Sequence, residues 1–89
     1  LALPSGSVRL RPSFAALVAA EGEVGSLFTL LERAGAGDLL LGDMAALMWH
    51  CAADGQADRA AFERQLMAAG PRALLAPYRA LLASIFGGG

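Results

Sequence analysis

The feature that most constrains the fold is the recurrence of apolar residues at helical spacing from Pro12 to Phe86. Apolar residues return every three or four positions, which is the period of an α-helix with one buried face. Glycine or proline interrupts the pattern between successive runs, and both residue types end helices. The sequence therefore predicts a mainly α protein, a small bundle of about four to five short helices.

The runs also predict where each helix begins and which face it buries. Pro12 and Ser13 are the start signal of the first helix, and Asp58 lies at or near the start of the fourth. Ser26 is a candidate N-cap of the second helix, because its side chain can accept a hydrogen bond from a free N–H group of the first turn. The third helix is expected to begin between Leu41 and Asp43 and to end near residues 54–55. The expected inward residues are Phe14, Leu17 and Val18; Leu27, Leu30, Leu31 and Ala34; Met44, Leu47, Met48 and Cys51; Phe62, Leu66 and Ala69; and, in the last helix, Leu74, Tyr78, Leu81 and Ile85 beside Leu75, Leu82 and Phe86.

Two prolines bear on the last helix. Pro71 is expected at a first helical position, where the missing N–H has no partner to lose. Pro77 lies inside the apolar run, where a proline costs about 3 kcal/mol in a helix interior. Either the helix kinks at Pro77 or a short turn precedes a helix that starts there. The apolar stripe continues in phase across Pro77, which favours the kink.

The first twelve residues follow a different period. Leu1 and Leu3 alternate with Ala2, and Val8 and Leu10 alternate with arginines, on either side of the turn-forming stretch "PSGS". This pattern predicts a short β-hairpin, which must lean on the helices because two strands alone are not stable. A chain of 89 residues is expected to form one domain, 1–89, with a hairpin at 1–12, helices over 13–86 and a flexible tail at 87–89.

The stretch "MWHC" holds the chain's one tryptophan, one histidine and one cysteine. Successive helical residues are rotated by about 100°. Trp49, His50 and Cys51 therefore cannot converge on one atom. We expect Cys51 to point inward, His50 to lie on the solvent face with Asp43, Ala46, Ala53 and Asp54, and Trp49 to lie on the edge between them. No enzyme activity, metal site or cofactor is expected, because a nucleophile pair or a zinc site needs converging ligands.

Charge gives little sign of a nucleic-acid or membrane partner. The net charge is −1, and no basic field of the kind that binds phosphates is present. Glu21 and Glu23 are expected to be solvated surface residues. The third and fourth helices, joined across "DGQAD", leave a helix-turn-helix DNA-binding regulator as an alternative. No run of apolar residues is long enough for a membrane span.

A surface that binds other proteins remains the best-supported kind of site. The hydrophobic fraction is 56%, and a small helical domain cannot bury all of it. Exposed apolar area rimmed by arginine is typical of protein contacts. The candidate contacts are Trp49, Tyr78 and Arg79, on the third and last helices, although the aromatic residues could equally belong to the core.

Three stretches carry a family resemblance: "VRLRPSFAAL", "GDMAALMWHC" and "GPRALLAPYRALL". Together with the positions Leu10, Arg11, Pro12, Glu21, Leu41 and Ala45, they make the chain similar to small gene transfer agent proteins that resemble phage tail assembly chaperones. The resemblance implies a non-enzymatic role in tail assembly in the bacterial cytoplasm. It implies tape-measure and tail-tube proteins as partners, with a homo-oligomer possible. A structural subunit of the mature tail is the alternative role.

Overall fold

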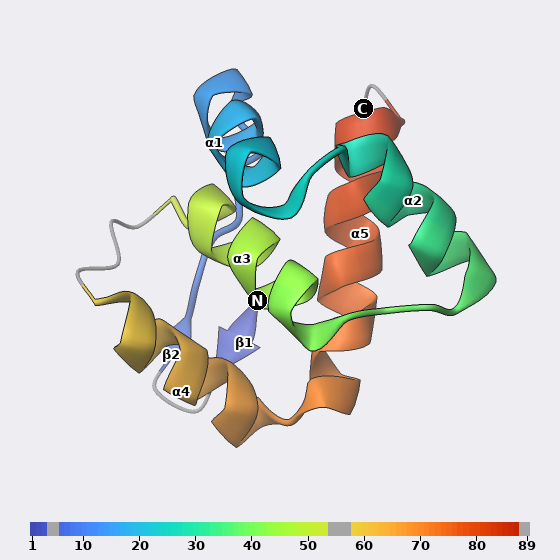
Figure 1. Ribbon diagram of the computed structural model, residues 1–89. Coiled ribbons are helices and arrows are strands. Elements are labelled where there is room, and N and C mark those ends of the chain that lie inside the picture. Colours follow the sequence, from blue (N-terminus) through green and yellow to red (C-terminus); the bar gives the residue numbers. More distant parts are fainter. Residues whose placement is uncertain (4–5, 54–57, 88–89) are drawn as a thin grey trace.

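The computed structural model describes residues 1–3, 6–53 and 58–87 and forms a helical bundle with a small N-terminal hairpin (Figure 1). Its elements are β1 (Ala2–Leu3), β2 (Gly6–Ser7), α1 (Phe14–Val24), α2 (Leu27–Ala36), α3 (Leu41–Cys51), α4 (Arg59–Ala69), the 3-10 helix η1 (Pro71–Leu74) and α5 (Leu75–Phe86). The mainly α fold with an N-terminal hairpin is confirmed. The expected tail falls largely on residues 88–89, which lie outside the described residues.

The hairpin is antiparallel and shorter than predicted. Ala2 lies opposite Ser7 and Leu3 opposite Gly6, so the second strand is made of residues that we expected in the turn. Residues 4–5 lie outside the described part. Leu3 and Val8 are buried, which confirms that the hairpin leans on the helical core. The chain after β2 is tied to the end of α3, where the Arg11 N–H donates to the Cys51 carbonyl at 2.7 Å.

Serine side chains cap the first two helices, at the predicted start signal Ser13 and at the predicted N-cap Ser26. Ser13 Oγ accepts a hydrogen bond from the Ala16 N–H, and Ser26 Oγ accepts one from the Phe28 N–H. Gly37 ends α2 with a left-handed backbone at φ 76°, a conformation that disfavours residues with a Cβ. The chain therefore turns sharply between α2 and α3.

The predicted inward faces of α1 and α2 are partly wrong. Phe14 and Val18 are exposed, at 83% and 51%, whereas α1 buries Ala20 completely. Leu31 in α2 is 39% exposed, although Leu30 is buried as expected. In α1 both faces carry small apolar residues, so the 3.6-residue period does not choose between them. Packing on α3 selects the alanine face, because small side chains allow two helix axes to approach closely.

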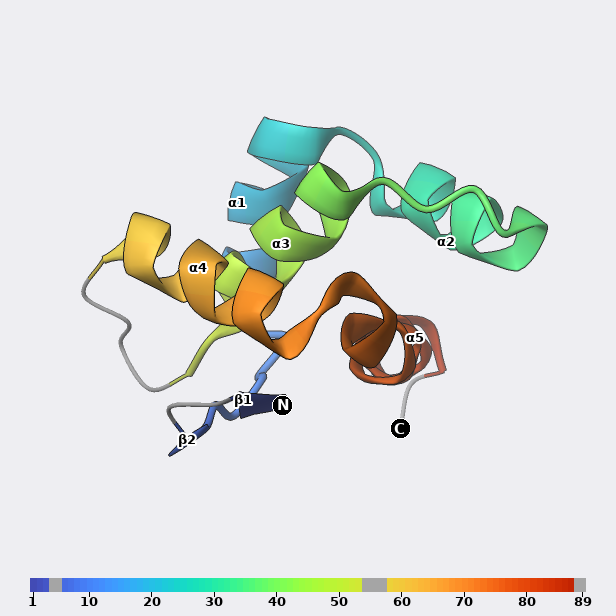
Figure 2. The ribbon, with the colours of Figure 1, turned by 90° about the horizontal axis from the view of Figure 1, so that it is seen from below.

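Helix α3 lies at the centre of the bundle, between α1 and α4 (Figures 1 and 2). Its predicted inward stripe is confirmed, since all four members are at most 3% exposed: Met44, Leu47, Met48 and Cys51. Ala46 was expected on the solvent face but is 1% exposed, because α3 is covered from more than one side.

The end of α3 also differs from the prediction. The helix ends at Cys51, and Ala52 has an extended backbone that forms a bridge with Leu10. Pairing with the segment after the hairpin thus replaces the last helical turn. Residues 54–55, at which the helix was expected to end, lie outside the described residues, and so does the expected placement of Asp54 on the solvent face.

The C-terminal third resolves the question of Pro77. Asp58 caps α4 by accepting from the Ala60 N–H at 3.0 Å, and Pro71 opens η1 in the expected first position. Helix α5 then starts at Leu75, so Pro77 lies in its first turn. The kink was wrong, and the alternative of a short turn before the helix is closer, because the 3-10 turn precedes α5 and places Pro77 where helical N–H groups have no partner within the helix. The rows of Tyr78, Leu81 and Leu82 face the core as predicted.

Membrane insertion was tested by length and hydropathy of the helices. Among the described residues no single helix is long and apolar enough to cross a bilayer. Only α1 and α2 taken together have the length and apolar composition of a span, and they are bent by 73° relative to each other.

Candidate functional site

The three rare residues of the "MWHC" stretch point to different surroundings. Cys51 is 1% exposed, and burial raises the pKa of its thiol to about 11. At neutral pH this thiol is protonated, and a thiol rather than a thiolate is a poor nucleophile and metal ligand. Trp49 is half-buried and packs its ring on Phe62, with ring centroids 5.7 Å apart. Cys51 thus points inward and Trp49 lies at the edge, as predicted.

His50 does not lie on a purely solvated face, which corrects the prediction. Its side chain is 21% exposed, and Nε2 lies 2.9 Å from Oε1 of Glu23 at the end of α1. Arg59, at the start of α4, donates from both terminal nitrogens to the same carboxylate, one of these bonds at 2.8 Å. Glu23 therefore joins α1, α3 and α4, and the prediction that it is only a solvated residue is wrong.

Electrostatics of this cluster, Glu23 with His50 and Arg59, follow from its geometry. The hydrogen bonds from Arg59, and then that from His50, lower the pKa of Glu23 from 4.5 to about 2. Arg59 is further held by Glu63, one helical turn on in α4, at 3.3 Å. These carboxylates hold the cation on the first turn of α4, which weakens the DNA-binding alternative. Within the described residues no group of three or more histidine, cysteine or acidic side chains could hold a metal ion.

The sequence contained no local signal for this cluster. Glu23 and His50 are 27 positions apart, and Glu23 and Arg59 are 36 apart. No helical period relates residues on three different helices, so only the packed fold reveals the contact.

The candidate contact residues on the last helix lie in opposite environments. Tyr78 is 1% exposed, so it is a core residue in this fold rather than a surface contact. Arg79 is exposed and makes no hydrogen bond or ion pair with the part of the chain that the structure describes. Contact with a partner through Trp49 or Arg79 stays a prediction.

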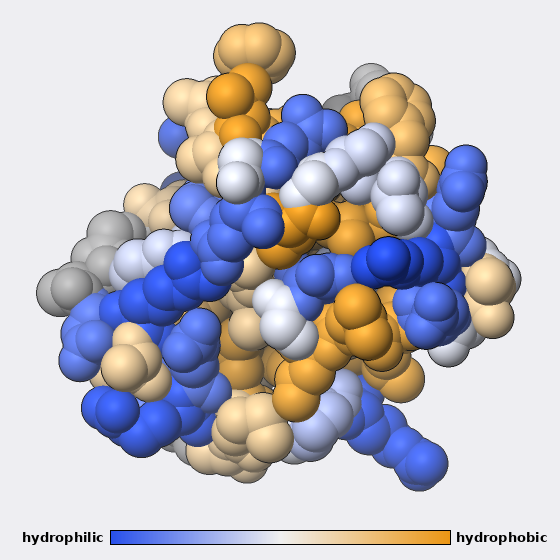
Figure 3. All heavy atoms as spheres, viewed as in Figure 1, coloured by the Kyte–Doolittle hydropathy of each residue, from blue (hydrophilic) through white to orange (hydrophobic). Residues whose placement is uncertain are grey.

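Exposed apolar side chains form the most unusual surface of the protein. Large hydrophobic residues in the described ranges that face solvent are Phe14, Val18, Phe28, Leu31, Leu40, Leu41 and Met67. Figure 3 shows hydrophobic atoms over α1 and over the neighbouring end of α2 and α5, separated by hydrophilic atoms. The sequence pattern does not mark these residues as exposed, because Phe14, Val18 and Leu31 fit the expected core stripes.

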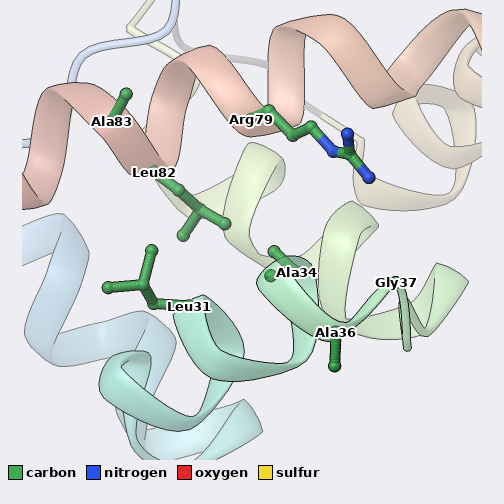
Figure 4. A pocket seen from close by; sticks show the side chains of 8 residues that line it. Leu31, Ala34, Ala36, Gly37, Arg79, Leu82 and Ala83 are labelled. Carbon is green, nitrogen blue, oxygen red and sulfur yellow. The ribbon is translucent and has the colours of Figure 1, made fainter.

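A groove lies between α2 and the neighbouring helix α5, whose axes are inclined to each other (Figures 1 and 2). Its hollow has a volume of about 560 Å³, with Leu31 and Leu82 on facing walls and Arg79 extending over the C-terminal end of α2 (Figure 4). At the other end the rings of Phe28 and Phe86 are 5.0 Å apart. The groove therefore has an aromatic end, an apolar middle and a cationic end.

Comparison with known proteins places the chain in a tail family. The model of a family described as "Phage tail tube protein, GTA-gp10" matches residues 1–88. No curated protein and no solved structure matches the chain. The resemblance to gene transfer agent tail proteins is thus confirmed at the level of the tail family, without the chaperone role. Because the match spans almost the whole sequence, the chain belongs to the GTA-gp10 family of phage tail tube proteins.

Proposed function

We propose that this protein is a structural subunit of a phage-like tail and that it binds neighbouring tail proteins through the exposed apolar side chains of α1 and α2. The family supports a role in the tail. The observation that carries the proposal is the exposure of Phe14, Val18, Phe28 and Leu31 on adjacent helices α1 and α2. Several large apolar side chains exposed on one small domain are typical of a protein interface.

The proposal includes no catalytic step and no cofactor. Its support is the burial of Cys51, whose raised thiol pKa keeps the nucleophile protonated, and the pairing of His50 with Glu23. A general base must reach the proton that it removes, and His50 and Cys51 are not placed to share one. We propose that assembly takes place in the bacterial cytoplasm.

A tail assembly chaperone is the second candidate, expected from the resemblance and served equally well by exposed apolar helices. A chaperone would bind tape-measure or tail-tube proteins during assembly and then leave. The two roles differ in one observable property, because a structural subunit remains in the finished particle.

The test is retention of the protein in particles purified from a strain that produces them. Immunoblots would compare the wild type with Phe28→Ser, and with Met67→Ser as the matched control on α4. We expect wild-type protein and the control to resist a high-salt wash, and Phe28→Ser to be depleted. Absence of the wild-type protein from particles that are otherwise complete would contradict the structural role and favour the chaperone.

A further inference from the structure

The groove between α2 and α5 has a definite length and polarity. The path from Phe28, at the aromatic end, to Gly35, which lines the pocket with Arg79, covers seven helical residues. This is about 10 Å along the axis of α2. Along this path the surface changes from the Phe28 and Phe86 ring pair, which lies outside the pocket lining, to the aliphatic side chains and then the guanidinium group that line the pocket (Figure 4). An occupant that fits must present an apolar group and a carboxylate at the same separation.

Arg79 defines the polar requirement. It is exposed and makes no hydrogen bond or ion pair within the described residues. A guanidinium group pairs most favourably with a carboxylate, to which it can donate two parallel hydrogen bonds. The groove is thus suited to an acidic amphipathic helix.

The exposed face of α1 has this pattern. Phe14, Val18 and Glu21 follow one another at i, i+4 and i+7, so they share one side of the helix. All three are exposed, and the phenyl ring and the carboxylate are seven residues apart, again about 10 Å. The Glu21 carboxylate accepts a hydrogen bond at Oε2 from the Leu27 N–H at 3.1 Å and remains at the surface.

We propose that α1 of one copy docks in the α2–α5 groove of a second copy. Phe14 packs against Phe28 and Phe86, Val18 covers the aliphatic middle, and Glu21 pairs with Arg79. The two surfaces differ, so the contact is head-to-tail and can add further copies. This inference rests on the proposed role as a structural subunit, and it names a second copy of the chain as the occupant.

Sedimentation equilibrium of the purified protein over a range of concentrations tests the contact. Wild type is expected to show a mass that rises with concentration. Phe14→Ser removes the apolar anchor of α1, and Arg79→Glu reverses the charge at the cationic end of the groove. Each variant is expected to weaken self-association by at least about tenfold. Met67→Ser, exposed on a different helix, is the control and is expected to associate like the wild type. Thermal unfolding of each variant checks that it remains folded.

Mixing the two defective variants gives the sharper test. Phe14→Ser keeps an intact groove and Arg79→Glu keeps an intact α1 face, so an equimolar mixture is expected to form a one-to-one dimer that does not grow. Wild type that stays monomeric at every accessible concentration would overturn the proposal, as would association that neither variant reduces. A monomer that uses Arg79 to bind a different tail protein would assign the groove to that protein and would also overturn it.

The result is separable from the proposed function. A protein that is retained in particles but does not self-associate refutes the head-to-tail contact and leaves the structural role standing. A protein that self-associates but is absent from particles refutes only the structural role.

Discussion

Removing the charge of Glu23 should destabilise the protein by an amount that depends on pH. The carboxylate accepts hydrogen bonds from Arg59 and His50 and so connects three helices. In Glu23→Gln the amide keeps the size of the side chain but loses the charge that these donors stabilise. The magnitude is limited by solvent, since the Glu23 side chain is 39% exposed. We expect a loss of about 1 kcal/mol at pH 7, in the upper range for a surface ion pair because Arg59 donates to the carboxylate from both terminal nitrogens.

The sign of the pH dependence follows from the shift in pKa. The pKa of Glu23 is about 2 in the folded protein and 4.5 when unperturbed. The stabilisation is therefore fully present above about pH 4.5 and is lost as the pH falls towards 2. The difference between wild type and Glu23→Gln should shrink over this interval and be nearly absent at its acid end.

Urea unfolding monitored by circular dichroism at pH 7, and at several values down to 2, measures this difference. At pH 7 a loss of about 1 kcal/mol corresponds to a melting temperature lower by about 4–8 °C for a domain of this size. Glu32→Gln, which removes an exposed carboxylate from α2, is the matched control and should have little effect at either pH. Equal stability of Glu23→Gln and wild type at pH 7, or a loss that stays undiminished at pH 2, would refute the reasoning.

Three further predictions concern the core, the thiol and a turn. Leu47→Ala should lower the free energy of unfolding in urea by about 2–5 kcal/mol, since Leu47 is fully buried. Leu40→Ala, at an exposed site, should lower it by less than about 1 kcal/mol. Similar losses for the two variants would show that α3 does not form the core. Cys51 should react with a thiol reagent at pH 8 at least about a hundredfold more slowly in native protein than in urea, and equal rates would contradict its burial. Gly37→Ala, at φ 76°, should lower the unfolding free energy by about 1 kcal/mol. Gly35→Ala, inside α2 with open space at its Cβ position, should raise the unfolding free energy. A lower unfolding free energy for both variants would contradict the left-handed turn at Gly37.

Local features of the fold could be predicted from the sequence. Ser13, Ser26 and Asp58 cap helices whose starts were predicted at or near these residues, because capping depends on one side chain and the N–H groups of the next turn. The stripe of α3 was equally predictable, since leucine and methionine recur there with a clear helical period.

Features that depend on the neighbours of an element were not predictable in the same way. The orientation of α1 was wrong because Phe14 and Ala20 lie on different faces, and hydrophobicity alone favoured the phenylalanine. Pro77 was misplaced because the 3-10 turn before α5 shifts where that helix begins. The pairing of Glu23 with Arg59 depends on three helices meeting, and the groove at Arg79 depends on α2 lying beside α5.

The number of copies of this protein in purified tails tests the central claim most directly. Quantitative mass spectrometry of washed particles, calibrated with isotope-labelled peptides, would count copies of the chain relative to the other tail proteins. A structural subunit predicts a fixed ratio in every preparation, with more than one copy in each tail. A chain that is abundant in the lysate of producing cells but absent from the purified tails would contradict the account.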